Sequence, residues 1–116
     1  MIRGSCLCGA VTFEYPNRPD KLTSCNCTAC RRYATWWAYG TDQEITLTGD
    51  TTGYTRENGK LVFHSCRRCG CPTHWSSIDL DYPGRMAVNM RLAEPADLEG
   101  IPIRHFDGLV SWTYLD

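Results

Sequence analysis

Cys6-Leu7-Cys8-Gly9 and Cys66-Arg67-Arg68-Cys69-Gly70 are two pairs of close cysteines, each followed directly by a glycine. Zinc sites favour such pairs on a tight turn, because two thiolates must reach one ion at about 2.3 Å. The glycine supplies unusual backbone angles and lets backbone N–H groups approach the sulfur atoms. One pair cannot fill a tetrahedral site, but two pairs can if a sheet brings their turns together. The sequence therefore predicts a closed, structural four-cysteine zinc site.

A third group, Cys25-Asn26-Cys27-Thr28-Ala29-Cys30, has three cysteines on one short stretch, which could hold a single ion by itself. Three protein ligands with an open fourth position are the arrangement of catalytic zinc. The open position can accept water, a substrate carbonyl or a substrate thiolate. The charge of the ion would then lower the pKa of the bound group. This stretch is the predicted catalytic zinc site.

Cys71 is the eighth cysteine, and its ligation decides between catalysis and scaffolding. If Cys71 completes the middle group, both sites are closed and neither has room for a substrate. Its place two positions after Cys69 favours the neighbourhood of the first site instead. Spacing alone leaves both ligations open.

Zinc is the preferred interpretation of the eight cysteines over four alternatives. Clustered thiols invite oxidation and metals, so burial as plain apolar residues is a poor explanation. The chain begins without an apolar stretch after a basic start, which favours the reducing cytoplasm, where disulfides are rare. Ligation by cysteine alone also suits an iron–sulfur cluster. A thioredoxin-like interpretation of Cys66 and Cys69 needs a strand–helix–strand context that the sequence pattern lacks.

The composition is that of an ordinary globular protein and predicts a single zinc-binding domain over residues 1–116. Hydrophobic residues make up 42% and charged residues 22%, which is not the profile of a disordered chain. The net charge of -1, without a basic stripe, argues against nucleic acid as a partner. No run approaches the roughly 18 apolar residues that span a bilayer, so no membrane partner is expected.

Short stretches between glycines and prolines alternate in the way that strands do. Residues 11–15 and 45–47 alternate apolar and polar side chains, and residues 86–93 show the clearest period of two. Helical signal is confined to a turn or two at residues 28–33 and one turn at 95–99, which has proline at an early position. The sequence predicts a mainly β, mostly antiparallel domain with little helix.

The order of the cysteine motifs resembles the GFA family, named for glutathione-dependent formaldehyde-activating enzyme and also described as the CENP-V/GFA domain. The motifs are Cys-x-Cys-Gly, Cys-x-Cys-x-x-Cys-Arg-Arg and Cys-x-x-Cys-Gly, and the match runs from Gly4 to about Asp107. The resemblance implies a β-tent fold of twisted antiparallel sheets stapled by zinc. It implies a structural zinc on Cys6, Cys8, Cys66 and Cys69, and a catalytic zinc on Cys25, Cys27 and Cys30. Many members carry Ser or Thr where this chain has Cys71.

The activity for which the family is named joins glutathione and formaldehyde into S-hydroxymethylglutathione and is classed as a carbon–sulfur lyase. The resemblance therefore implies an enzyme with two zinc ions per chain that acts on a thiol/small-carbonyl adduct, with glutathione as one candidate thiol. Membership of a broad family does not fix the substrate. Two other functions stay open: a non-catalytic zinc-stapled module that binds a protein, and a redox or metal sensor whose middle cysteines release zinc on oxidation.

Charged and polar residues near the middle cysteines are candidates for substrate contacts. Arg31 and Arg32 could neutralise the three thiolates or bind a substrate carboxylate, although a solvated surface pair is the commoner role. Asn89 and Arg91 share one face of an expected strand whose other face is apolar. They could point into a pocket or into water.

Aromatic residues and histidines complete the list of candidates. Trp36, Trp37 and Tyr39 follow the middle cysteines and could line a pocket, but packing in the core is as common a role. His74 is the preferred histidine for a general base or a fourth metal ligand, because it follows Cys71 closely. A hydrogen-bonded core histidine is the commoner alternative.

Overall fold

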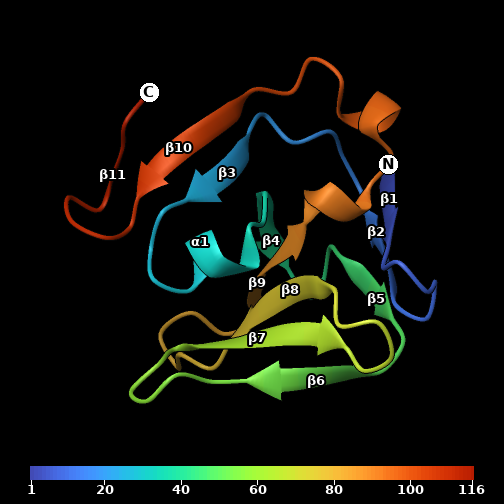
Figure 1. Ribbon diagram of the computed structural model, residues 1–116, viewed down its shortest axis with the longest axis horizontal. Helices are drawn as coiled ribbons and strands as arrows, with labels where there is room; N and C mark the ends of the chain where they lie inside the picture. The colour runs from blue at the N-terminus through green and yellow to red at the C-terminus, as the bar shows by residue number, and fades with distance from the viewer.

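The structure, a computed structural model that describes residues 1–116, consists of two sheets with one short helix and two 3₁₀ turns (Figure 1). The strands are β1 (Ile2–Ser5), β2 (Thr12–Tyr15), β3 (Leu22–Cys25), β4 (Trp37–Thr41), β5 (Thr46–Thr48), β6 (Thr51–Tyr54), β7 (Leu61–Cys66), β8 (Pro72–Ser77), β9 (Arg85–Asn89), β10 (Ile103–Asp107) and β11 (Thr113–Tyr114). The helical elements are α1 (Cys30–Tyr33), η1 (Met90–Leu92) and η2 (Pro95–Leu98). No helix has the length and apolar character needed to cross a membrane.

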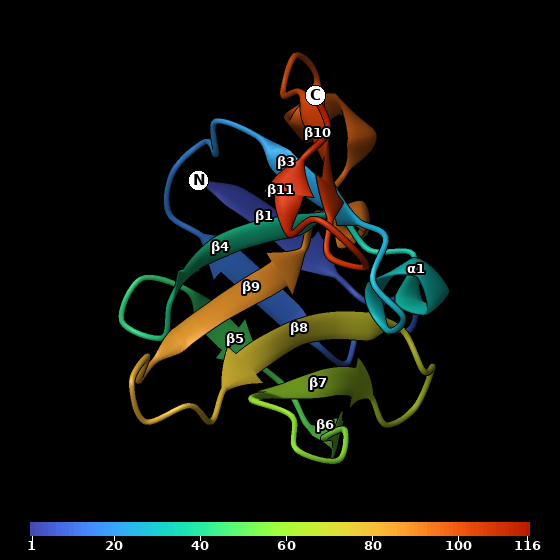
Figure 2. The ribbon, with the colours of Figure 1, turned by 90° about the vertical axis from the view of Figure 1, so that its left-hand side faces the viewer.

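The small sheet has the order β1-β2-β5, and the large sheet has the order β11-β10-β3-β4-β9-β8-β7-β6. Figure 2 shows β4, β9, β8, β7 and β6 following one another across the large sheet, with α1 at one side. Every strand pair is antiparallel except β3 and β10, which run parallel. The predicted mainly β fold with little helix is therefore confirmed, with one parallel pair that the sequence pattern did not indicate.

Two apolar clusters cover the two faces of β9. Met86 and Val88 belong to the larger cluster, which also takes Ile2 and Phe13 from the small sheet. Ala87, on the opposite face, belongs to a second, largely aromatic cluster. The core is therefore continuous from the small sheet through β9 to the aromatic face of the large sheet.

The strand predicted from the alternation of residues 86–93 is shorter than expected and does not have a solvent face. Residues 86–89 are all buried, because both faces of β9 are covered. The strand ends at Asn89, whose side-chain oxygen accepts the backbone N–H of Arg91 at 3.1 Å and begins the 3₁₀ turn η1. Met90 to Leu92 was wrongly predicted as strand, because this local side-chain hydrogen bond competes with the ladder.

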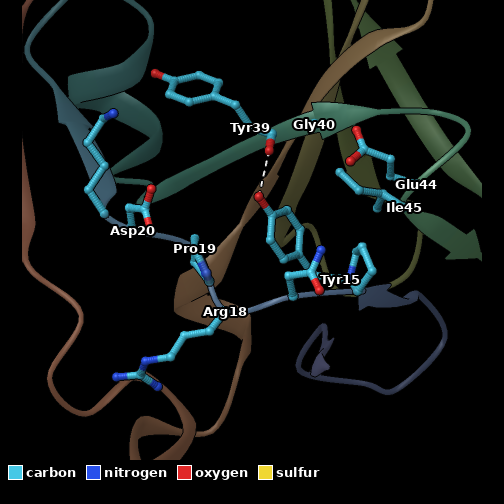
Figure 3. Close-up of a pocket in the computed structure, with 11 residues that line it drawn as sticks. Tyr15, Arg18, Pro19, Asp20, Tyr39, Gly40, Glu44 and Ile45 are labelled. Atoms are coloured by element: carbon cyan, nitrogen blue, oxygen red, sulfur yellow. Dashed lines mark hydrogen bonds between the residues drawn. The ribbon is translucent and has the colours of Figure 1, made fainter.

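The small sheet is held to the large one by a polar contact as well as by the core. The Tyr15 hydroxyl of β2 donates a hydrogen bond of 2.6 Å to the backbone carbonyl of Tyr39 in β4 (Figure 3). This contact forms one wall of a polar surface pocket of about 300 Å³ beside residues 16–21. Burial raises the pKa of Tyr15, which keeps the hydroxyl protonated as a donor.

Gly4 lies directly under an aromatic ring. Gly4 pairs with Phe13 across β1 and β2, and a Cβ atom at position 4 would overlap the Phe13 ring. Phe13 is itself 2% exposed, so its ring has no free space into which to move. The packing of the small sheet therefore requires glycine at this position.

Replacing Gly4 by alanine is expected to lower the free energy of unfolding by about 1 to 3 kcal/mol, the usual cost of overpacking a core. Urea unfolding of the two proteins under the same conditions would measure this difference. Arg3→Ala is the matched control, because the Arg3 side chain on the same strand is exposed. Equal unfolding midpoints for Gly4→Ala and the wild type would contradict this account of the small sheet.

Candidate metal centres

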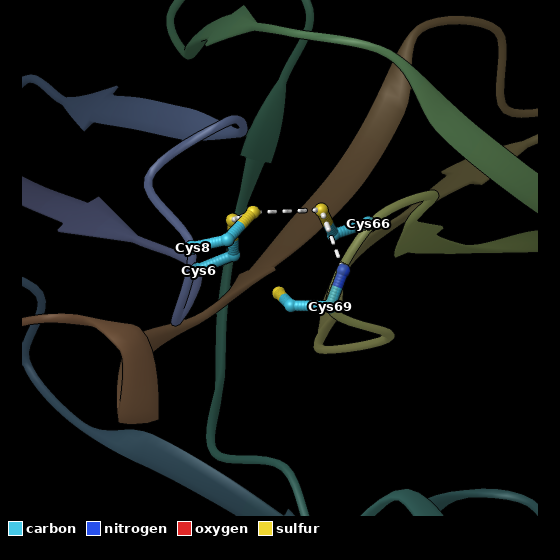
Figure 4. Close-up of side chains that lie close together, drawn as sticks. All are labelled: Cys6, Cys8, Cys66 and Cys69. Carbon is cyan, nitrogen blue, oxygen red and sulfur yellow. Dashed lines mark hydrogen bonds between the residues drawn. The ribbon is translucent and has the colours of Figure 1, made fainter.

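Four sulfur atoms from distant parts of the chain meet between two turns (Figure 4). Cys6 and Cys8 follow β1, whereas Cys66 ends β7 and Cys69 lies on the next turn. The four Sγ atoms lie within 4.8 Å of one another, at 3.7 Å between Cys6 and Cys8 and 3.6 Å between Cys8 and Cys66. Four thiolates at about 2.3 Å from one tetrahedral ion would be about 3.8 Å apart. This group can therefore hold one metal ion in a closed site.

Both turns of this group have glycine in the left-handed backbone region, as their sequences require. Gly9 has a φ of 84° and Gly70 a φ of 80°. The turn at Gly9 brings the N–H of Val11 to within 3.3 Å of the Cys6 sulfur, to which it donates. Backbone N–H donors stabilise thiolates and fix their orientation, which suits metal ligands.

The three middle cysteines also come together, on a loop that links β3 to α1. Cys25 ends β3, Cys27 lies in the loop and Cys30 begins α1, with their Sγ atoms within 4.8 Å of one another. The N–H of Cys30 donates to the Cys27 sulfur at 3.2 Å, and the N–H of Cys27 donates to the Cys25 sulfur at 3.5 Å. A hydrogen bond with Cys30 lowers the pKa of the Cys25 thiol to about 6. The same hydrogen bond raises the pKa of Cys30, so Cys25 is the first of this pair to lose its proton. The three sulfurs together can hold a metal ion with three ligands.

Trp37 supplies a further donor to this group from β4. Its indole N–H donates to the Cys30 sulfur at 3.3 Å, and Trp37 is 2% exposed. A buried indole N–H needs an acceptor, and a thiolate is a charged one. Sequence reasoning considered Trp37 as a pocket wall or a core residue. The structure shows it packed in the aromatic cluster and also bonded to a candidate ligand.

The turn after β10 lies over the middle cysteines, a contact for which no sequence motif is a signal. A Cβ atom at Gly108 would lie 2.7 Å from the Cys25 sulfur and 3.2 Å from Cys27 Cβ. Asn26 ties the two segments together, because its side chain donates to Asp107 and accepts the N–H of Leu109, both at 3.1 Å. The segment after β10 therefore forms part of the wall of this centre.

Cys71 lies with the first group and not with the second. Its sulfur accepts the N–H of Leu7 at 3.4 Å, and its side chain packs beside the cluster that contains Cys6 and Cys66. The backbone N–H of Cys71 lowers the pKa of the Cys69 thiol to about 5. The middle group consequently contains three cysteines, and the first group has a fifth sulfur as a neighbour.

Neither cysteine group includes a histidine. His74, the preferred candidate from the sequence, stacks on His64 with ring centroids 4.1 Å apart and shares a 2.9 Å hydrogen bond with Thr73. It is 8% exposed, which fits the alternative of a hydrogen-bonded core histidine. Burial, with a smaller contribution from His64, lowers the pKa of His74 to about 4.

A cavity of about 540 Å³ borders the middle loop, and some but not all of the arginine candidates line it. Arg31 and Arg91 line this cavity, whereas Arg32 lies outside it and donates to the Thr28 carbonyl at 2.8 Å. Asn89 does not line it, because its side chain is buried and donates to the Pro72 carbonyl at 2.8 Å. Of the polar pair expected on one strand face, only Arg91 reaches the cavity.

Gly108→Ala is expected to remove the metal of the middle group and to leave the first group intact. The new methyl group would lie too close to the Cys25 sulfur, which would have to move away. A sulfur that ligates a metal ion cannot move away without losing the ion. Native mass spectrometry of Gly108→Ala without a chelator should show one bound metal ion per chain, where the wild type should show two. Leu109→Ala, at an exposed position on the same turn, should retain both. Two bound ions per chain in Gly108→Ala, as in the wild type, would contradict the close approach of Gly108 to the Cys25 sulfur.

The lowered pKa of His74 predicts a loss of stability in mild acid. The unfolded chain, in which histidine has a pKa of about 6.5, binds this proton more readily than the folded protein does. The stabilising contribution is therefore present above about pH 6.5 and is lost as the pH falls toward 4. Between about pH 7.5 and about pH 5, the free energy of unfolding of the wild type should fall by about 1 to 2 kcal/mol more than that of His74→Gln. Urea unfolding at constant zinc concentration measures this difference, and parallel pH profiles would refute it.

Comparison with known proteins places the fold and the sequence in a family. A solved crystal structure of a protein from Rhodobacter sphaeroides superimposes with a TM-score of 0.69 at 27% sequence identity, covering 88% of this chain and 99% of that one. None of the curated proteins matches this sequence. The family model described as glutathione-dependent formaldehyde-activating enzyme matches residues 1–98. The chain therefore belongs to the GFA family, as its cysteine motifs predicted.

Proposed function

We propose that this protein is a zinc-dependent enzyme of the carbon–sulfur lyase type that acts on a thiol/small-carbonyl adduct such as S-hydroxymethylglutathione. One observation carries the proposal: the middle group has three cysteines, and the eighth cysteine lies with the other group. A three-thiolate site leaves a coordination position for a substrate. The description of the family supports the choice of glutathione and formaldehyde as the first compounds to test.

The proposed ligands follow the two groups of sulfur atoms. Structural zinc would be held by Cys6, Cys8, Cys66 and Cys69, and catalytic zinc by Cys25, Cys27 and Cys30. Tetrahedral sites made of thiolates suit zinc, and the sulfur spacing of the first group supports a single ion. All eight cysteines are free of disulfides, and the proposed cytoplasmic location would keep them reduced.

The residues around the middle group would tune and shield the reaction. Bound zinc would supply positive charge that stabilises a substrate thiolate or polarises a carbonyl oxygen. The N–H groups of Cys27, Cys30 and Trp37 draw negative charge from the three sulfurs, which limits the loss of Lewis acidity. Gly108 and the aromatic cluster pack against the three cysteines from two sides. In the overall reaction the C–S bond forms as the C=O π bond breaks, and the thiol proton ends on the oxygen.

The test combines metal analysis with turnover. The wild type should bind two zinc ions, one of which a mild chelator removes, and should accelerate exchange between formaldehyde and its glutathione adduct in NMR. Cys27→Ala should keep one zinc and return the exchange rate to the uncatalysed value, since two thiolates no longer hold the ion. Cys71→Ser is the matched control and should retain both zinc ions and the activity.

Two results would overturn the proposal. Catalysis by Cys27→Ala would show that the middle group is not the reacting centre. The second result is a wild type in which both zinc ions resist the chelator and a Cys71→Ser variant that loses one of them. It would mean that both sites are closed by four thiolates. The protein-binding module would then be the better interpretation.

A further inference from the structure

The cavity beside the middle cysteines is lined mainly by polar and charged side chains. It lies between α1, β3 and β10 and has a volume of about 540 Å³, within the range of about 300 to 1,000 Å³ typical of small-molecule sites. Arg31 follows the ligand Cys30 directly, and Arg91 reaches the cavity from η1. Two guanidinium groups from distant segments thus share one concave surface.

Neither arginine has an acidic partner within the chain. The ion pairs in the molecule involve Arg3, Arg104 and His105, and none includes Arg31 or Arg91. Asp116 also lines the cavity, but its carboxylate accepts from His105 twice, from the backbone N–H at 2.8 Å and from Nδ1 at 2.7 Å. The two guanidinium groups are left without a carboxylate ligand.

Arg91 is held in place before any ligand arrives. Its guanidinium carbon lies 3.9 Å from the centroid of the Trp36 ring, a short cation–π contact. Its backbone N–H is fixed by the Asn89 side chain at 3.1 Å. A guanidinium stacked in this way keeps its N–H edge free for a planar anion, which lowers the entropy cost of binding.

We propose that this cavity binds a carboxylate group through Arg31 and Arg91, and so selects carboxylate-bearing thiols for the reaction. The selection of thiols rests on the proposed function, but carboxylate binding does not. Arg31 and Arg91 are the two permanently cationic side chains that line the cavity, which favours an anionic ligand. The planar carboxylate also matches the fork of a guanidinium.

A binding experiment tests the cavity without any turnover. The probe is (methylthio)acetate, which has a carboxylate but no free thiol, and its methyl ester is the uncharged reference. Titration of the zinc-loaded protein in NMR should shift the Arg31 and Arg91 Nε–H signals with the acid and not with the ester. Arg31→Gln and Arg91→Gln should each weaken binding by about tenfold, as expected for loss of one charged hydrogen-bonding partner. Arg32→Gln removes the same charge outside the cavity and should leave the dissociation constant unchanged.

A kinetic experiment tests the role in substrate selection. With formaldehyde as the carbonyl, Arg31→Gln should raise KM for thioglycolate by about tenfold with little change in kcat, and should leave KM for mercaptoethanol unchanged. Zinc content should stay at two per chain. Competitive inhibition by (methylthio)acetate against thioglycolate would show that the carboxylate of the substrate binds in the cavity. Non-competitive inhibition would assign it to a separate free carboxylate and overturn the selection of thiols.

The two proposals fail in different ways. Equal shifts with acid and ester, or equal weakening in Arg32→Gln, would overturn the carboxylate site even if the enzyme is active. A wild type that accelerates no thiol–aldehyde reaction, but binds the acid through Arg31 and Arg91, would overturn the proposed function and leave the carboxylate site standing.

Discussion

Four cysteine sulfur atoms join the turn after β1 to the turn after β7, and the two sheets depend on this junction. The Cys8 sulfur lies 3.7 Å from that of Cys6 and 3.6 Å from that of Cys66. The small sheet contributes only a few apolar side chains to the common core, among them Ile2 and Phe13. A domain of this size with so many short strands is helped by a metal that ties distant turns together. With the turns tied, Val11 and the two buried cysteines form their own small cluster at the corner of the molecule.

The middle group depends on that frame, because its three cysteines draw support from elements that only the complete large sheet brings together. Cys25 comes from β3, Trp37 from β4, and the covering turn at Gly108 follows β10. The parallel pairing of β3 with β10 sets the register that brings residues 107–109 over the loop. An N–H group donates to each sulfur, and no cationic side chain is bonded to any of the three. Arg31, which follows Cys30, is therefore not bonded to a sulfur and lines the neighbouring cavity.

Much of the fold followed from local patterns, and the errors have a common cause. The mainly β class and the short helical turns at residues 30–33 and 95–98 agree with the sequence. The alternation from Met86 onward indicated one long strand whose polar face points into a pocket or into water, but both faces of β9 are covered, and Asn89 ends the strand. His74 was favoured because it is close in sequence to Cys71. Alternation along β8 instead directs it onto His64, within the sheet.

The sequence by itself determined which cysteines share a turn, since Cys-x-Cys and Cys-x-x-Cys with a following glycine are local geometries set by a few backbone angles. It also determined the family, because the order and spacing of these motifs are properties of the chain. The tertiary structure alone decided that Cys71 lies with the first group, that Trp37 bonds to Cys30, and that Arg31 and Arg91 share a cavity. Those relations join residues from 7 to 64 positions apart. Their contacts depend on which distant strands and turns meet, and the local pattern of one segment does not specify its partner segment.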